Sequence, residues 1–185
     1  MFRLLEKDVA TFQQATGLGC IAGCGRCCQK ADISATTLEF IPFAYHLYKQ
    51  GEAFTWYERL NANKNNGMCP AFSPILAPGA KGFCNAYAYR GLICRLFGFS
   101  AMLDKEGEPK LVTCKPIKET FSSEVEKAHL HISEGKKTPV MRNYYFQLRN
   151  VDPELGNKLM PINIAMLEAL KIVLAYYAYP RRKGA

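Results

Sequence analysis

The sequence lacks the short motifs that mark several common enzyme classes. It contains no Walker-type or dinucleotide-type glycine loop, no G-x-S-x-G string and no H-E-x-x-H string. These absences remove support for nucleotide-dependent enzymes and for hydrolases built on a local motif. The function must therefore be sought in other residues.

Histidine is also scarce, with three residues in 185. His129 and His131 are two positions apart in a predicted helix, so they point to different faces and are poorly placed to chelate one ion. His46 lies on another predicted helix, in a stripe of apolar residues typical of a buried core. Histidine is therefore not expected to dominate a metal site.

We expect neither a targeting segment nor a membrane span. The opening string MFRLLEKDVATFQQ carries four charges and no continuous apolar stretch, so we expect no secretion signal and a cytoplasmic protein. Residues 162–179 are strongly apolar, but Asn163, Glu168 and Lys171 interrupt them. They predict a buried core helix and no membrane span. A homodimer interface formed by Tyr176, Tyr177 and Tyr179 is the alternative role of this helix.

Cysteine, in contrast, is abundant and clustered. Four of the eight cysteines lie within nine residues, in the string GLGCIAGCGRCCQK. A soft metal centre needs about four thiolates that converge on one point, and a glycine-rich loop can fold its sulfurs inward. Gly19, Gly23 and Gly25 alternate with these sulfurs and can adopt positive φ. All eight cysteines are candidate metal ligands: Cys20, Cys24, Cys27, Cys28, Cys69, Cys84, Cys94 and Cys114.

Eight cysteines allow several site plans, among them one four-iron cluster, two four-thiolate sites or four disulfides. Disulfide scaffolds are usually short secreted chains, whereas this chain has 185 residues, is 49% hydrophobic and can bury a core without covalent crosslinks. A bridge between the adjacent Cys27 and Cys28 would also close a strained ring. A metal site is therefore favoured over disulfides and over inert buried thiols.

The order and context of the cysteines resemble those of the YkgJ-like cysteine-cluster family. The similarity rests on the run C-x3-C-x2-C-C, on CPAF at Cys69, on CNAYAYRGLICRLFGF from Cys84 and on the late Cys114, and covers roughly residues 18–115. The sequence departs from the family pattern at two places. Three residues, instead of two, separate Cys20 from Cys24, and Gly91 stands where the family commonly has proline. Without that proline, the backbone at Gly91 should be less fixed.

This resemblance implies a zinc- or iron-chelating protein, and the cysteine signature is also similar to that of the flagellin lysine N-methylases. Four cysteines are crowded into residues 20–28, whereas the other four are scattered singly along the chain. This irregular spacing favours an iron-sulfur cluster of the 4Fe-4S type over zinc. The first predicted ligand set is Cys20, Cys24 and one of Cys27 or Cys28, with Cys84 or Cys94. A second centre would use Cys69, Cys114 and the remaining pair.

Basic residues stand beside several cysteines, and the formal net charge is +8. Arg90 and Arg95 are predicted to contact the cofactor, because a guanidinium can donate to anionic sulfur or clamp an anionic substrate. Arg26 is a weaker candidate. The basic residues are distributed along the chain without an aromatic-basic repeat, so nucleic acid is not an expected partner.

The length and the lack of low-complexity linkers predict a single domain over residues 1–185, with a cysteine core at about 18–115 and a C-terminal helical part at about 116–180. We expect a mainly α fold whose helices pack around an irregular metal-binding core with one short β-hairpin. Predicted helices cover 2–15, 34–50, 53–63, 117–133, 139–150 and 161–179, and the hairpin joins 96–103 to 109–114.

Two functional hypotheses follow from the sequence. In the first, the chain carries an iron-sulfur cluster and acts in redox or group-transfer chemistry. In the second, it is a zinc-organised structural or interaction module without catalysis. The sequence leaves open whether the chain is an enzyme and which protein or small molecule is its partner.

Overall fold

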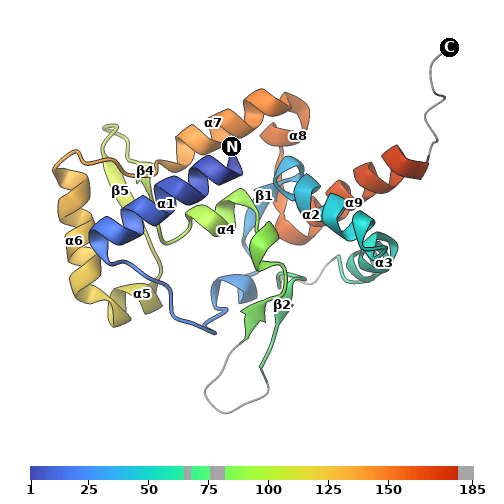
Figure 1. Cartoon of the computed structure of the whole chain (residues 1–185), viewed down its shortest axis with the longest axis horizontal. Coiled ribbons are helices and arrows are strands. Elements are labelled where there is room, and N and C mark those ends of the chain that lie inside the picture. The colour runs from blue at the N-terminus through green and yellow to red at the C-terminus, as the bar shows by residue number, and fades with distance from the viewer. Residues whose placement is uncertain (65–67, 76–81, 179–185) are drawn as a thin grey trace. The chain divides into compact units, whose positions relative to one another are not determined.

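The computed structural model describes residues 1–64, 68–75 and 82–178. Within this part the fold is mainly helical, with three small two-stranded antiparallel sheets (Figure 1). The chain forms two compact units, each built from two separate stretches of sequence. Unit 1 comprises Met1–Cys24 and Leu92–Val151, and unit 2 comprises Gly25–Gly91 and Asp152–Ala185.

Unit 1 combines five helices with one hairpin. Its first helix ends where Gly17 adopts a left-handed conformation, with φ of 75°, and donates its N–H to the Gln13 carbonyl. The hairpin turn uses Gly107, with φ of 89°. The elements of unit 1 are α1 (Phe2–Thr16), α4 (Leu92–Leu96), β4 (Ser100–Leu103), β5 (Pro109–Val112), α5 (Lys115–Thr120), α6 (Ser122–Ser133) and α7 (Met141–Val151).

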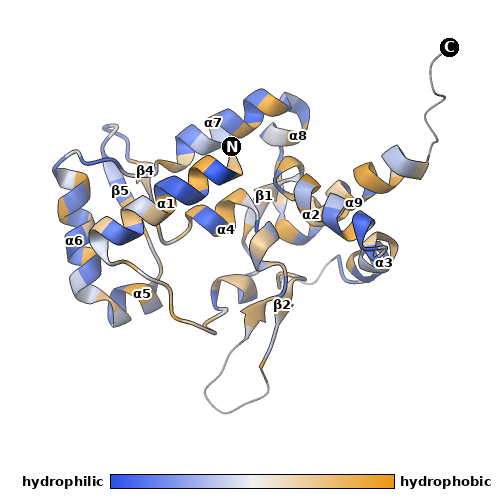
Figure 2. Cartoon of the chain, viewed as in Figure 1, coloured by the Kyte–Doolittle hydropathy of each residue, from blue (hydrophilic) through white to orange (hydrophobic). Residues whose placement is uncertain are grey.

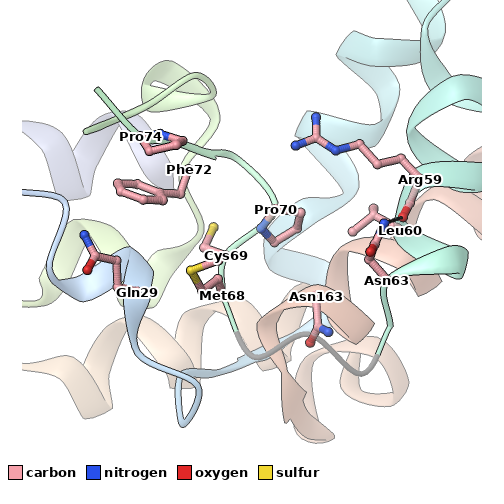
Figure 3. Close-up of a pocket in the computed structure, with 10 residues that line it drawn as sticks. All are labelled: Gln29, Arg59, Leu60, Asn63, Met68, Cys69, Pro70, Phe72, Pro74 and Asn163. Atoms are coloured by element: carbon pink, nitrogen blue, oxygen red, sulfur yellow. Dashed lines mark hydrogen bonds between the residues drawn. The ribbon is translucent and has the colours of Figure 1, made fainter. Parts of the chain in front are cut away.

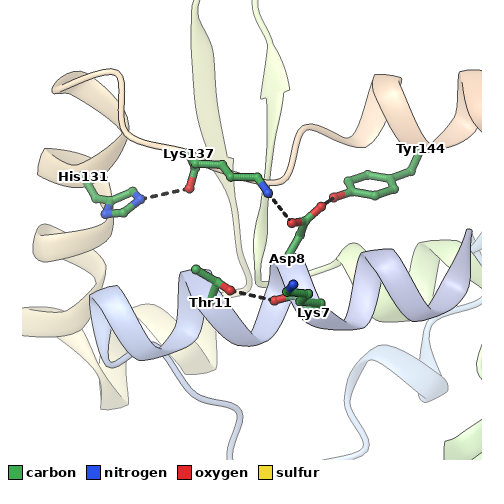
Figure 4. A network of polar contacts seen from close by, with 6 residues as sticks. All are labelled: Lys7, Asp8, Thr11, His131, Lys137 and Tyr144. Atoms are coloured by element: carbon green, nitrogen blue, oxygen red, sulfur yellow. Dashed lines mark hydrogen bonds and ion pairs between the residues drawn. The ribbon is translucent and has the colours of Figure 1, made fainter.

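The core of unit 1 lies between α1, α6 and the hairpin. Its central residues are fully or almost fully buried, and they include Phe12, Leu18, Ala101 and Ala128. A polar network adjoins this core at Asp8, whose carboxylate accepts hydrogen bonds from Lys137 and Tyr144 (Figure 4). Lys137 lies in the segment before α7, and Tyr144 lies in α7. One side chain of α1 therefore links this helix to a part of unit 1 that is distant in sequence.

Unit 2 contains the longest helix and the shortest strands. β1 pairs with β6 over three residues, and β2 pairs with β3 over two. The elements of unit 2 are η1 (Cys27–Gln29), β1 (Ser34–Thr36), α2 (Thr37–Lys49), α3 (Ala53–Ala62), β2 (Phe72–Ser73), β3 (Phe83–Cys84), η2 (Tyr87–Tyr89), α8 (Pro153–Asn157), β6 (Leu159–Pro161) and α9 (Ile162–Ala178).

The helical core of unit 2 forms where α9 packs against α2 and α3. Most residues of α9 are hydrophobic (Figure 2), and eight of its side chains are buried. The prediction of a buried core helix is therefore confirmed. In the described residues, none of the helices meets the length and hydropathy needed to cross a membrane. Tyr179 lies outside the described residues, and the homodimer stays a prediction.

A capping box begins α2. The N–H of Thr36 donates to the Glu39 carboxylate over 2.8 Å, and Glu39 is 1% exposed. Gly91 is packed against the same turn, because a Cβ placed there would lie 2.7 Å from Cζ of Phe40. Gly91 therefore leaves no room for a Cβ, and the expectation that the backbone there is less fixed without a proline stays a prediction.

The mainly α fold class and the hairpin are confirmed, and the errors concern the bounds of helices. Residues 34–36 form a strand instead of the first turn of a helix, because they pair with β6. The helix predicted over 117–133 is two helices separated at Phe121, whose ψ of 46° is not helical. The short helices α4 and α8 were not predicted. The single domain stays a prediction.

Candidate metal centre

The glycines of the cysteine run shape the loop that precedes η1. Gly23 and Gly25 adopt φ of 67° and 54°, as the sequence predicted for these positions, whereas Gly19 does not adopt positive φ. A Cβ on Gly25 would overlap the ring of Phe72 in β2. The absence of that Cβ allows the loop to lie directly against β2, and the N–H of Cys28 then donates to the Gly25 carbonyl over 3.0 Å.

Two further cysteines, Cys69 and Cys84, lie close to Cys27 and Cys28 because of backbone hydrogen bonds around β2 and β3. The N–H of Cys69 donates to the carbonyl of Cys28 over 2.8 Å, which joins the two segments directly. Cys84 is the register partner of Phe72, and the N–H of Asn85 donates to the Ala71 carbonyl over 2.8 Å. Backbone pairing therefore brings four cysteines of unit 2 together from three segments of the chain: Cys27, Cys28, Cys69 and Cys84.

The side chains of these four cysteines interact with one another. The Sγ atoms of Cys27 and Cys28 are 4.0 Å apart, and Cys28 also forms a thiol hydrogen bond with Cys69. Cys84 is close enough to influence the ionisation of Cys28 and to respond to that of Cys27. Cys28 is thus coupled to each of the other three thiols, and thiolates are donors that zinc and iron bind.

Three of these thiols have a raised pKa. The hydrogen bond with Cys28, followed by desolvation, raises the pKa of Cys27 far above its ordinary value. A hydrogen bond from Cys27 lowers the pKa of Cys28, but the bond with Cys69 and burial outweigh it and raise that pKa to about 12. Burial raises the pKa of Cys84, against the opposing charge of Arg90. These three thiols are therefore protonated at neutral pH, and an incoming ion must displace their protons.

The other four cysteines belong to unit 1. Cys20 is exposed in the loop after α1, and the N–H of Cys24 donates to the Ile21 carbonyl over 3.2 Å. Cys94 lies in α4, and Cys114 precedes α5 and packs against the core of unit 1. The first predicted ligand set takes residues from both units and stays a prediction.

None of the eight cysteines, all of which are described, forms a disulfide. The preference for a metal site over a disulfide framework stays a prediction. Within residues 1–64, 68–75 and 82–178, no three His, Cys, Asp or Glu side chains already stand in an arrangement that would hold an ion. The four thiols of unit 2 are gathered, and binding of an ion would require their side chains to turn toward a common point.

The two arginines predicted to contact a cofactor have different surroundings. The Arg90 guanidinium lies 3.6 Å from the ring centroid of Tyr87, and its charge acts to lower the pKa of Cys84. Arg95 forms an ion pair with Glu6 of α1 and lies over the ring of Phe2 at 5.1 Å. The charge of Arg90 thus acts on a thiol of unit 2, and the contact of Arg90 and Arg95 with a cofactor stays a prediction.

A cavity of about 640 Å³ adjoins the buried Cys69 (Figure 3). Arg59 supplies the charged group in its lining, and Gln29, Asn63 and Asn163 supply amides. The apolar part of the lining comes from Leu60, Met68, Pro70, Phe72 and Pro74. The cavity makes one side of the cysteine cluster accessible to a small molecule.

Sequence reasoning missed the residues that line this cavity. Arg59 and Asn63 lie on α3, whereas Asn163 lies a hundred positions later on α9 and donates to the Lys64 carbonyl over 2.5 Å. No local motif joins residues so distant in sequence. The available signal was Asn163, one of three polar residues in a mainly apolar helix, and it was interpreted only as evidence against a membrane span.

The fold and the cysteine cluster together define a class, that of mainly helical proteins with clustered free thiols suited to a soft metal ion. The family model named CxxCxxCC, described as "putative zinc- or iron-chelating domain", matches residues 19–123, which is more than half of the chain. The chain belongs to this family, as the resemblance indicated. No curated protein and no solved structure matches the chain.

Proposed function

We propose that the chain is a metal-binding protein whose first centre is formed by Cys27, Cys28, Cys69 and Cys84. The observation that carries this proposal is the gathering of these four thiols in unit 2 by η1, the turn before β2, and β3. Thiolates of this kind are ligands of zinc and iron, the two metals in the family description.

The separation of the adjacent sulfurs favours one tetrahedral ion. Two sulfurs bound to one ion at 2.3 Å with tetrahedral angles are about 3.8 Å apart, and the Sγ atoms of Cys27 and Cys28 are 4.0 Å apart. An ion bound by all four thiolates would stabilise the fold, because β2 and β3 pair over two residues in the described part of this region. Arg90 would then stabilise the thiolate form of Cys84.

The second candidate is a 4Fe-4S cluster with a redox or group-transfer role. It is supported by the irregular cysteine spacing, in which a tight run is combined with distant single cysteines. A cluster bound here would supply electron-transfer chemistry, and the cavity beside Cys69 would give a small molecule access to it.

Metal and acid-labile sulfide content, measured on protein purified without oxygen, separates the two candidates. One zinc or iron per chain without sulfide supports the tetrahedral ion, whereas about four irons and four sulfides support the cluster. Protein that contains neither metal, and that binds neither zinc nor iron when they are added, would contradict both.

A pair of variants tests the ligand assignment. Cys69→Ser removes a thiol of the unit 2 set, and Cys20→Ser removes an exposed thiol that only the first sequence-based set contains. We expect Cys69→Ser to lose most of its metal and Cys20→Ser to keep the metal content of the unmodified chain. The opposite result would restore the sequence-based set.

A further inference from the structure

A second cavity of unit 2 has a lining unlike that of the cavity beside Cys69. It measures about 340 Å³, within the range of about 300–1,000 Å³ found for small-molecule sites. Four aromatic side chains and one carboxylate characterise its wall: Phe43, His46, Trp56, Tyr89 and Glu52. Neither lysine nor arginine occurs among the described residues that line it.

The rings form two walls that meet at nearly a right angle. The planes of His46 and Tyr89 differ by 18° and their centroids are 4.1 Å apart, and Tyr89 is inclined by 33° to Phe43. Trp56 stands at 85° to Phe43 with a centroid distance of 5.2 Å. Two such walls can present ring faces and edges to one compact guest from different directions.

The electrostatics of the cavity select a cationic guest. Ring faces carry negative electrostatic potential and attract cations, Trp most strongly. The Arg59 guanidinium lies 5.3 Å from the Trp56 centroid, although Arg59 does not line the cavity, so the Glu52 carboxylate must offset its charge for a cationic guest. Glu52 is exposed at the start of α3, and within the described part of the chain its carboxylate forms no ion pair.

We propose that this cavity binds a small organic cation with a quaternary ammonium group, held by the aromatic walls and by the Glu52 carboxylate. A compact, weakly hydrated cation suits ring faces, whereas a strongly hydrated metal ion would need more oxygen ligands than one carboxylate. The chain has a net charge of +8, so long-range attraction would not draw cations to it. Binding must therefore come from this local arrangement, and it does not depend on which metal the cysteines hold.

The test uses choline and its neutral isostere 3,3-dimethyl-1-butanol, in which carbon replaces the charged nitrogen. Trp56 is the single tryptophan of the chain and lines this cavity, so intrinsic tryptophan emission reports on a guest bound beside it. Both compounds are titrated into the metal-loaded full chain at constant chloride concentration. We expect a saturable emission change with choline and an affinity for the alcohol at least about fivefold lower.

Two variants separate the proposed site from general surface effects. Glu52→Gln should weaken choline binding about fivefold and leave the response to the alcohol unchanged. Glu58→Gln removes an exposed carboxylate of the same helix that does not line the cavity, and it should bind choline as the unmodified chain does. Circular dichroism checks that both variants stay folded.

Three results would overturn the proposal. The first is equal affinity for choline and the alcohol, which would describe a purely apolar cavity. The second is an equal effect of the two glutamine variants. The third is a lack of saturable emission change together with no choline signal in saturation-transfer NMR.

Discussion

At the scale of single residues, Asp8 links distant parts of unit 1. Its two carboxylate oxygens accept hydrogen bonds from Lys137 over 2.6 Å and from Tyr144 over 2.7 Å. These bonds, with the charge of Lys137, lower the pKa of Asp8 and outweigh the opposing effect of burial. Burial, together with the Asp8 carboxylate, raises the pKa of Tyr144, so this tyrosine keeps its proton and donates at neutral pH.

The lowered pKa makes unit 1 sensitive to acid through Asp8. A carboxyl whose pKa is depressed by folding stabilises the folded state above its unfolded pKa of about 3.9, and this stabilisation is lost as the pH falls through the folded pKa. Asp8→Asn should therefore lower the free energy of unfolding by about 1–2 kcal/mol at pH 7. Below about pH 4 the difference between the variant and the unmodified chain should shrink.

Urea denaturation at pH 7 and at pH 3.5 measures this effect. Glu126→Gln, which removes an exposed carboxylate of α6 in the same unit, serves as the control and should change stability by less than about 0.5 kcal/mol. A stability loss in Asp8→Asn that is the same at both pH values would contradict an electrostatic role for Asp8.

At the scale of elements, the cysteine cluster depends on a close approach of the glycine loop to β2. Gly23 and Gly25 both have positive φ, but only Gly25 would clash through a Cβ, with Phe72 and the Gly82 carbonyl. No described atom lies within 4 Å of a Cβ placed on Gly23. An L side chain at either position would therefore have the same unfavourable backbone conformation. Only at Gly25 would it also disturb the packing of the glycine loop, and hence of η1, against β2.

This difference predicts unequal effects of two alanine substitutions. Each should cost about 1 kcal/mol for the positive φ, and Gly25→Ala should cost about 1–3 kcal/mol more because Phe72 must move. We expect Gly25→Ala to bind zinc at least about tenfold more weakly than Gly23→Ala in a competition assay with a chromophoric chelator. Equal zinc affinities would show that the contact with Phe72 does not position the thiols.

At the scale of the whole molecule, the chain passes between its two units at three points, and two of these interrupt the order of the cysteines. One passage falls between Cys24 and Cys27, and another between Cys84 and Cys94. The eight cysteines are thereby divided into four in each unit. The unit 2 set depends on short strands and 3-10 turns, whereas unit 1 has a continuous buried core.

Metal removal should therefore affect the chain unevenly. We expect a chelator to raise amide hydrogen exchange at least about tenfold in residues 25–33 and 82–91, because few backbone pairs hold these segments once the ion has left. Exchange in α6 should stay unchanged, since its protection comes from the apolar core of unit 1. Hydrogen-exchange mass spectrometry with and without chelator measures both regions, and a uniform increase would contradict the assignment of the centre to unit 2.

The sequence by itself determined the local features of this protein. Apolar periodicity placed α1, α2, α3 and α9 to within a few residues. The hairpin around Gly107 was also predictable, since two apolar segments flank a turn sequence. The cysteine order indicated the family, because thiol spacing is read directly from the chain.

Only the tertiary structure decided which distant residues meet. The pairing of 34–36 with β6 overrode the helical pattern of that segment, and the division into units separated Cys20 and Cys24 from Cys27 and Cys28 despite their closeness in sequence. In the aromatic cavity, Trp56 of α3 and Tyr89 of η2 lie together because both line it with residues of α2. Such contacts depend on packing between elements, which no local pattern encodes. The sequence therefore predicted which residues could bind a metal, but it did not predict which of them lie together.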